Sequence, residues 1–272
     1  MKTIKTRLIA IFTVVILVIT GVIGFVAIRI VSNELLEDAH NDLQTVAEIE
    51  ARYIGSVVNA QLLYLEGIAE NIVFQHGEIS YEEQVAFLEQ EAERAGYECF
   101  TFADFEGNAV QLDRSGIELN VSERDYFQRA LNGEPNVSDV IISRTTEEPI
   151  IIYAVPIDLD GQQTGVFYGV REGAVLSRIA NEIPVGETGF AYVVNNEGTI
   201  VGDYDIDNVL NQLNIIQEAQ KNPEFKERAE FTENQMLLRE SGSGGYSFGE
   251  SNRIVGFAPI EGSPWITVVA VE

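Results

Sequence analysis

The chain has 272 residues, enough for one large domain or two smaller ones that each bury a core. Its 43 acidic residues outnumber its 17 basic residues and give a formal net charge of −26 at pH 7. Such a surface excludes binding of nucleic acid or anionic lipid through general electrostatics, because both partners are negative.

The cysteine and histidine content excludes two further classes of site. Cys99 is the only cysteine, so no internal disulfide can form, and its apolar surroundings in "YECFTFAD" predict a buried structural thiol. Only His40 and His76 are present, which removes most zinc sites and most Ser-His-Asp catalysis. We therefore expect no enzyme active site, no cofactor and no metal.

Residues 1–31 predict a short cytoplasmic tip followed by a transmembrane helix. The stretch 8–28 carries no charge and is long enough to cross a bilayer, so the span is placed within 8–30. Lys2, Lys5 and Arg7 precede it and all the acidic residues follow it, which favours a cell-membrane protein with residues 32–272 extracytoplasmic. A cleaved signal peptide is the alternative, although its apolar core is usually shorter and ends in a small-x-small site.

Residues 32–77 predict a long stalk helix. The stretch 33–75 contains no proline and repeats apolar residues at helical spacing over roughly 60 Å. The apolar stripe could pack against the protein's own domain, against a second copy, or against both, and its length favours a homodimer. "SYEE", with Ser80 and Glu83, is a capping box that starts the next helix, and Gly96 ends it.

The rest of the chain contains an internal repeat. "FTFADFEGNAV" (100–110) matches "AYVVNNEGTIV" (191–201) at a constant offset, and "IIYAVPI" (151–157) matches "IVGFAPI" (254–260). In the first pair, Glu-Gly marks a hairpin turn between apolar strands. These matches predict an α+β fold with two modules of the same type, 78–172 and 184–272, each a five-stranded antiparallel sheet with helices on it. Residues 173–183 predict a connecting helix.

The phrase "SERDYFQRALNG" (122–133) predicts a short helix with an inward arginine. Ser122 and Asp125 form an S-x-x-D cap, and Gly133 follows the end. Arg124 lies three residues before Phe127, which faces the core, so both point to the same side. An inward guanidinium needs an anion, which is either one of the chain's own carboxylates or the carboxylate of a ligand.

The chain after the anchor resembles the double Cache sensor domain of bacterial transmembrane receptors. The phrases that carry the resemblance are "RDYFQRALNGE", "VSDVIISRTTEEPIIIYAVPI", "VGETGFAYVVNNEGTIVGDYD" and "SGSGGYSFGESNRIVGFAPIEGSPWITVVAVE". The resemblance implies that the two modules are PAS-like and that the chain is a non-enzymatic small-molecule sensor whose membrane-distal module binds the ligand. It also implies a second membrane span after residue 272 and a cytoplasmic output of the chemotaxis, histidine kinase or diguanylate cyclase type.

In amino-acid-binding receptors of this family, an R-x-aromatic-aromatic phrase holds the ligand carboxylate and two acids hold its ammonium group. The chain matches the first part but has arginines at or beside the two acid positions. These departures favour a small organic anion over an amino acid, with two strand tyrosines as further walls; either arginine could instead be surface charge. The predicted ligand-binding residues are Arg124, Tyr126, Phe127, Ser143, Arg144, Tyr153, Tyr168 and Arg171.

Three alternative functions have weaker support in the sequence. "DYDID" (203–207) has the spacing that opens a calcium loop but lacks the later glycine and glutamate, so a turn and a helix cap by Asp207 are expected. An anchored hydrolase lacks any nucleophile-base or metal-ligand motif. A membrane-anchored structural or adhesion module without a small-molecule ligand remains the main alternative.

Overall fold

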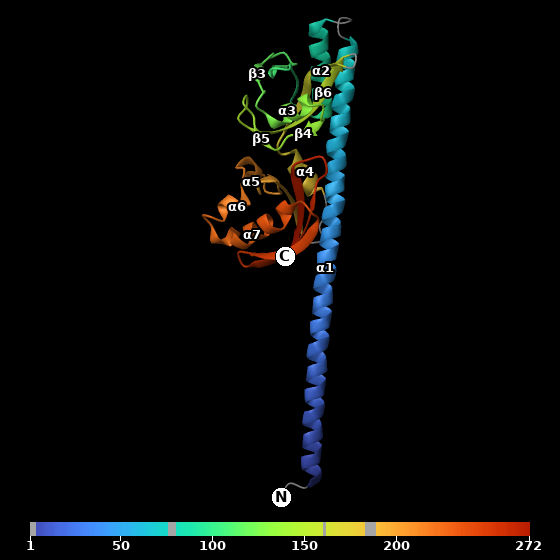
Figure 1. Ribbon diagram of the computed structural model, residues 1–272. Coiled ribbons are helices and arrows are strands. Elements are labelled where there is room, and N and C mark those ends of the chain that lie inside the picture. The colour runs from blue at the N-terminus through green and yellow to red at the C-terminus, as the bar shows by residue number, and fades with distance from the viewer. Residues whose placement is uncertain (1–3, 76–79, 160–161, 183–188) are drawn as a thin grey trace.

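The computed structural model describes residues 4–75, 80–159, 162–182 and 189–272. Its first element is α1 (Ile4–Gln75), an unbroken helix that runs the length of the molecule, and two sheet modules lie along its C-terminal half (Figure 1). At about 1.5 Å per residue the helix is roughly 108 Å long. The first proline of the chain is Pro135, so no proline interrupts the helix.

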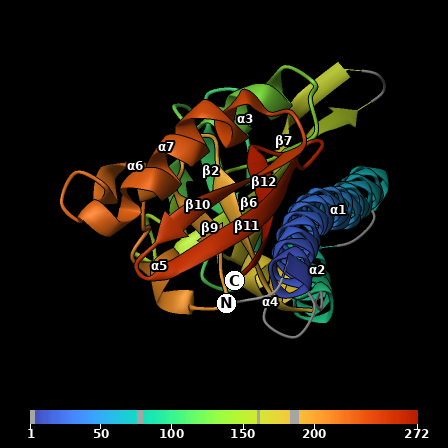
Figure 2. The same ribbon diagram turned by 90° about the horizontal axis from the view of Figure 1, so that it is seen from below.

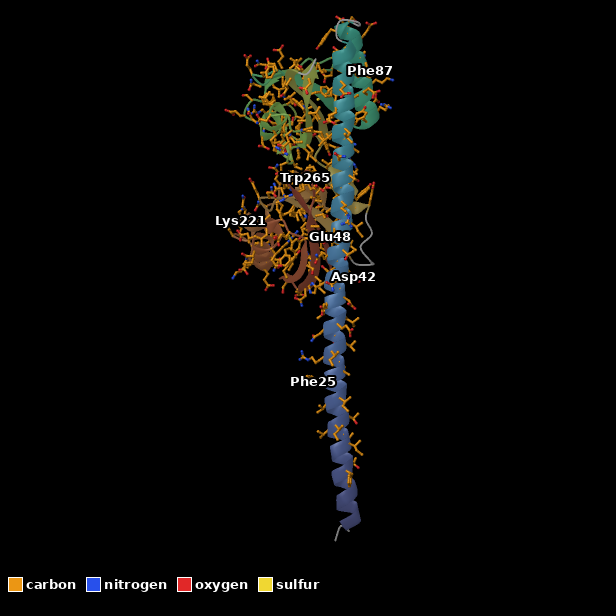
Figure 3. All side chains as sticks on the ribbon, turned by 45° about the vertical axis from the view of Figure 1, so that its right-hand side comes forward. Phe25, Asp42, Glu48, Phe87, Lys221 and Trp265 are labelled. Atoms are coloured by element: carbon orange, nitrogen blue, oxygen red, sulfur yellow. The ribbon has the colours of Figure 1, made fainter. Side chains whose placement is uncertain are left out.

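The N-terminal half of α1 projects away from both modules. Phe25, with 61% of its surface exposed, lies on this free part (Figure 3). Among the described residues, α1 is the one helix that is long and apolar enough to cross a membrane. The free part therefore coincides with the span predicted within 8–30.

The C-terminal half of α1 buries one stripe of its surface against both sheets. The buried members of the stripe are Leu43, Ala47, Glu50, Ala51, Ile54, Val58, Leu62, Leu65, Ile68 and Ala69. They recur every three or four residues, which is the spacing that puts side chains on one helical face. Of the three arrangements considered for the stripe, the structure shows contact with the protein's own modules.

Helix α2 (Tyr81–Ala95) packs beside the C-terminal end of α1 and begins and ends as predicted. The Ser80 hydroxyl accepts a hydrogen bond from the Glu83 backbone N–H (3.3 Å), and the Ser80 N–H donates to the Glu83 carboxylate (3.0 Å). Gly96 ends the helix with φ = 74°, a left-handed conformation that glycine adopts without strain. The capping prediction is confirmed.

The distal sheet is antiparallel and lies against the C-terminal part of α1. Its strands are β1 (Cys99–Ala103), β2 (Asn108–Gln111), β3 (Glu118–Asn120), β4 (Asn136–Val137), β5 (Ile141–Ile142), β6 (Pro149–Leu159) and β7 (Gln162–Glu172). The order is β3-β2-β1-β7-β6-β4, and β5 also pairs with β6. Helix α3 (Asp125–Leu131) covers the face of this sheet that points away from α1.

The proximal sheet has the order β10-β11-β12-β8-β9 and packs on α1 closer to the N-terminus. Its strands are β8 (Phe190–Asn195), β9 (Ile200–Gly202), β10 (Gly242–Phe248), β11 (Ser251–Pro259) and β12 (Trp265–Val271). The helices are α4 (Val175–Asn181), α5 (Ile206–Leu210), α6 (Ile215–Glu218), η1 (Pro223–Phe225), α7 (Lys226–Asn234) and η2 (Met236–Leu238). Figure 2 shows α1 on one side of this sheet and α6 and α7 on the other.

The two sheets share a topology, and the α+β fold class is confirmed. The order β2-β1-β7-β6 corresponds to β9-β8-β12-β11, and the predicted turn glycines Gly107 and Gly198 have φ of 79° and 78°. The distal sheet is larger than the predicted five strands, because two- and three-residue strands pair at its margins. Strands of two or three residues are too short to show the alternation of apolar and polar residues by which a sequence predicts a strand. The predicted boundaries 77/78 and 183/184 lie outside the described residues.

One acidic residue of the distal module is held by the proximal module. Asp139, between β4 and β5, accepts hydrogen bonds from the Asn195 Nδ2 (2.5 Å) and from the Trp265 Nε1 (3.3 Å). Its own loop adds a third donor, the Val140 backbone N–H (2.8 Å). Burial raises the pKa of Asp139, although these hydrogen bonds oppose the rise. Figure 3 places Trp265 at the level where the two modules meet.

Candidate functional site

A pocket of about 350 Å³ lies on the face of the distal sheet that points away from α1. Its floor comes from strands β1, β6 and β7, and its walls come from β2, β5, the start of α3 and the segment 143–146. The floor residues alternate along each strand, since successive side chains of a strand point to opposite faces. They are Cys99, Thr101, Ile150, Ile152, Tyr168 and Val170.

Arg124 lies on the pocket wall as the residue that precedes the first turn of α3. Its backbone is extended (φ −81°, ψ 132°), which turns its side chain out of the helix and toward the pocket. Within the described part of the chain, no carboxylate lies within 4.0 Å of the Arg124 guanidinium. The internal ion pair considered for this residue is therefore not seen.

The predicted cap of α3 was wrong. Ser122 does not cap the helix, because its hydroxyl donates instead to the Asn120 Oδ1 (2.6 Å). The helix starts two residues later than expected, since the backbone of this segment is tied to the β1–β2 turn by a bond from the Val121 N–H to the Gly107 carbonyl (2.8 Å). This tie also positions the next residues, including Arg124, at the pocket mouth.

Two tyrosines meet at the floor of the pocket. The rings of Tyr126 and Tyr168 are 5.5 Å apart in an edge-to-face arrangement. Burial raises the pKa of Tyr126 to about 12, while Arg124, a hydrogen bond with Tyr168 and Arg144 oppose the rise. Both guanidinium groups therefore lie close enough to act on this phenol, and the pocket has a cationic end.

Arg144 and Ser143 reach the pocket from the segment that joins β5 to β6. Arg144 donates from Nη1 to the Asn120 carbonyl (2.7 Å). This bond does not use the other two guanidinium nitrogens of Arg144, which lines the pocket. The buried Ser143 hydroxyl bonds with the Thr145 hydroxyl (2.9 Å) and accepts the Thr146 backbone N–H (3.1 Å). Ser143 thus shapes the turn that carries Arg144.

Three of the predicted ligand-binding residues do not line this pocket. Phe127 is buried in the core beneath α3. Tyr153 points toward α1, with its ring edge 6.2 Å from the ring of Tyr97. Arg171 lies 5.3 Å over that same ring and donates from Nε to the Gly96 carbonyl (3.1 Å).

The alternation of side chains along a strand explains why Tyr153 and Arg171 lie outside the pocket. Tyr153 pairs with Gly169 and Ala154 pairs with Tyr168, so Tyr153 and Tyr168 lie on opposite faces of the sheet. Arg171 is three residues after Tyr168 and falls on the α1 face as well. The sequence predicted both strands but not which face of each would meet α1.

Two carboxylates that the sequence did not predict also line the pocket. Glu98 and Asp113 line the pocket beside Cys99. Burial raises the pKa of the Cys99 thiol to about 12, and these two carboxylates add to the rise. The pocket therefore carries both signs of charge, with arginines beside Tyr126 and acids beside Cys99. Acids that can accept an amino group are therefore present in the pocket, although not at the two positions that the family resemblance implies.

No sequence signal pointed to those acids. Glu98 stands immediately before β1 and Asp113 two residues after β2, and each belongs to a region rich in charge. They meet because β1 and β2 form an antiparallel hairpin that brings its two ends together. A weaker signal existed for the floor, since small residues at 99, 101 and 103 alternate with Phe100 and Phe102.

A model of the Cache domain, of the double Cache type, matches residues 28–272. The methyl-accepting chemotaxis protein PctB of Pseudomonas aeruginosa is 22% identical over 183 residues. That match covers 66% of this chain and 29% of PctB, so the chain spans less than a third of this curated relative.

Solved ligand-binding domains share the fold. The domain of PctB from P. aeruginosa, in complex with L-arginine, has a TM-score of 0.65 at 21% identity, covering 87% of this chain and 96% of its own. The domain of the chemoreceptor CtaA from Pseudomonas fluorescens, in complex with L-serine, has a TM-score of 0.65 at 22% identity, and the match covers 87% of this chain and 98% of that domain. The domain of PctC from P. aeruginosa, in complex with GABA, has a TM-score of 0.63 at 20% identity, and the match covers 85% of this chain and 99% of that domain.

Proposed function

The chain belongs to the Cache-domain family over residues 28–272, and on that basis we propose that it is the ligand-binding sensor region of a bacterial membrane receptor that signals in chemotaxis. The observation that carries the proposal is Arg124, which lines the distal pocket and has no carboxylate partner among the described residues. A guanidinium held in this way is preorganised for an anionic group of a ligand.

The proposed ligand is a small molecule with a carboxylate. Arg124 and Arg144 would hold the carboxylate above the Tyr126–Tyr168 floor, and Glu98 with Asp113 would accept an amino group at the other end. The sequence-based preference for an organic anion over an amino acid finds no support in the relatives, whose solved complexes contain amino acids. Amino acids are therefore the first class to test and simple organic acids the second.

Replacing Arg124 by alanine is the test of this function. We expect thermal-shift screening of the chain in detergent to find a stabilising amino or organic acid, and the Arg124→Ala variant to bind it about 100-fold more weakly, because a charge-assisted bidentate contact is lost. Arg114→Ala is the matched control, since Arg114 is exposed and pairs with Glu89 at the surface. A library without any stabilising compound would favour the adhesion alternative.

Asp139 offers a route from the pocket to the proximal module. The loop from Asp139 to Arg144 joins the pocket wall to Trp265, the first residue of β12. A ligand that draws Arg144 inward would move this segment and, with it, the contact between Asp139 and the proximal module. The ligand must bind the arrangements before and after this movement with different affinity to shift the balance between them. Trp265 is the only tryptophan of the chain, so its fluorescence reports on this joint.

The Asp139→Ala variant should bind the ligand but report it poorly. We expect ligand titration to change the Trp265 emission of the unmodified chain and to change that of the variant much less. The variant should also lose about 2 kcal/mol of unfolding free energy, because three buried donors, on Asn195, Trp265 and Val140, lose their acceptor. Asp158→Ala, at an exposed position of β6, is the control. An unaltered ligand-induced change in the variant would rule out this route.

The proposal also includes a membrane span in α1 and a homodimer. Residues 8–30 of α1 cross the membrane, and residues 32–272 lie outside the cytoplasm. A homodimer forms through the outer side of α1, where Ile49, Tyr53 and Leu63 are 54%, 45% and 58% exposed. A chain that sediments only as a monomer in detergent would contradict the dimer.

A further inference from the structure

The outer face of the proximal sheet corresponds to the face that carries the distal pocket. Tyr192 of β8 occupies the repeat position of Thr101 of β1, and each pairs with the last strand of its own module, β12 or β7. In the distal module this face forms the floor of the pocket. In the proximal module it is covered by α5, α6 and α7, and Tyr192 is fully buried.

A buried arginine lies on this face. Arg228 of α7 is only 6% exposed, and its Nε has no hydrogen-bond partner. Within the described ranges, no carboxylate lies within 4.0 Å of its guanidinium. The guanidinium carbon lies 4.7 Å from the ring centre of Tyr192, 5.7 Å from that of Phe248 and 5.9 Å from that of Phe225.

Two buried phenols add a hydrogen-bond donor beside this cation. The hydroxyl oxygens of Tyr192 and Tyr246 are 3.3 Å apart, so one of them donates to the other. A pair of hydroxyls that shares one bond retains one O–H for a further acceptor. The Tyr192 hydroxyl also lies beside the Arg228 guanidinium, so the phenols and the guanidinium form one polar cluster in the interior of the module.

The nearest candidate counter-charge is already engaged. Asp203 accepts hydrogen bonds from the Asp205 N–H (3.0 Å) and from the Asn208 Nδ2 (3.3 Å), and it acts on Arg228 only from beyond ion-pair distance. The aromatic faces offset part of the cost of burying the guanidinium, but neutral rings do not replace an anion.

A second arginine raises the positive charge at the edge of the same cluster. The guanidinium of Arg253 in β11 lies 4.7 Å from the ring centre of Phe248 and 5.1 Å from that of Phe190. Its Nη2 pairs with Glu272 (3.1 Å), whereas its Nε is buried without a partner. Both arginines thus flank Phe248.

We propose that the proximal module binds a small monovalent anion, a halide or a short carboxylate, between the Arg228 guanidinium and the Tyr192–Tyr246 hydroxyl pair. The anion is small because the Arg228 guanidinium is buried among the rings of Tyr192, Phe225 and Phe248. This site is separate from the distal pocket, and it does not depend on the function proposed for that pocket.

The test compares anions at constant ionic strength. The chain in detergent is melted in sodium gluconate and in mixtures with increasing sodium chloride or sodium formate. We expect chloride, formate or both to raise the melting temperature in a saturable way, by about 5–10 °C at 100-fold excess over the dissociation constant. A melting temperature that is equal in all three salts would overturn the proposal.

Three variants separate specific binding from a general salt effect. Tyr246→Phe removes one hydroxyl and should weaken anion binding about 10-fold while the fold is kept. Arg228→Gln should abolish the response. Arg178→Gln, which breaks an exposed ion pair between α4 and Glu172, is the control and should keep the full response. An undiminished anion response in Tyr246→Phe and in any folded Arg228→Gln protein would show that the anion acts elsewhere.

Discussion

Replacing Gly256 by alanine is expected to lower the free energy of unfolding by about 3 kcal/mol or more. Gly256 lies in β11, where the backbone of α1 comes so close that an added Cβ would overlap with the carbonyl group of Leu43 and the amide nitrogen of Gln44. Backbone atoms of a helix cannot move aside as the end of a side chain can. The helix and the proximal sheet would therefore have to separate along this contact.

Gly67 provides a matched control for that substitution on α1 itself. An added Cβ at Gly67 meets no atom within 4 Å, so Gly67→Ala should be neutral or stabilise the chain by about 0.5–1 kcal/mol through helix propensity. Equilibrium denaturation of both variants in the same detergent measures the difference. If Gly256→Ala were as stable as Gly67→Ala, the close approach of α1 to β11 would not exist in solution.

A Glu50→Gln substitution is expected to stabilise the chain at pH 8 by about 3 kcal/mol and to change little at pH 4. Glu50 lies on α1, faces β12 and has no solvent exposure. Neither of its carboxylate oxygens has a hydrogen-bond partner among the described residues. Burial raises its pKa from 4.5 to about 7, and the hydroxyl of Thr267, close by but outside hydrogen-bonding geometry, opposes the rise.

The direction of the pH effect follows from the raised pKa. Below about pH 4.5 the carboxyl is neutral in the folded and the unfolded chain, so its burial carries no charge penalty. Between about 4.5 and 7 the unfolded chain ionises first, and stability falls as the pH rises. Above about 7 the folded chain must bury a charge or loosen the contact between α1 and β12, and the loss levels off.

Denaturation curves between pH 4 and 8 measure the Glu50 contribution as the difference between variant and parent. Glu37→Gln, at an exposed position of α1, controls for the loss of a surface carboxylate. A difference that stays constant over the whole range would show that Glu50 does not titrate in this window. A pH-dependent difference would mean that protonation of Glu50 alters how firmly the proximal module packs against α1.

Local patterns in the sequence were sufficient for the elements and for part of the site. Apolar residues at helical spacing without proline predicted α1, the capping box predicted α2, and matched hairpin glycines predicted the repeat. Arg124 and Tyr126 were predicted at the pocket from the R-x-aromatic-aromatic phrase of the family resemblance, and both line it. The helical spacing used for Arg124 does not apply, because Arg124 precedes the helix. Apart from the repeat, which compares two distant segments, each of these signals depends on neighbours within a few residues.

The tertiary structure alone decided which surfaces meet. A strand has two faces, and its own alternation is the same whichever face α1 covers, so Tyr153 and Arg171 were placed in the pocket although they lie behind it. Glu98 and Asp113 come together only through the pairing of β1 with β2. Glu50 and Asp139 look like ordinary surface acids in the sequence, because burial of a carboxylate is a property of what packs around it.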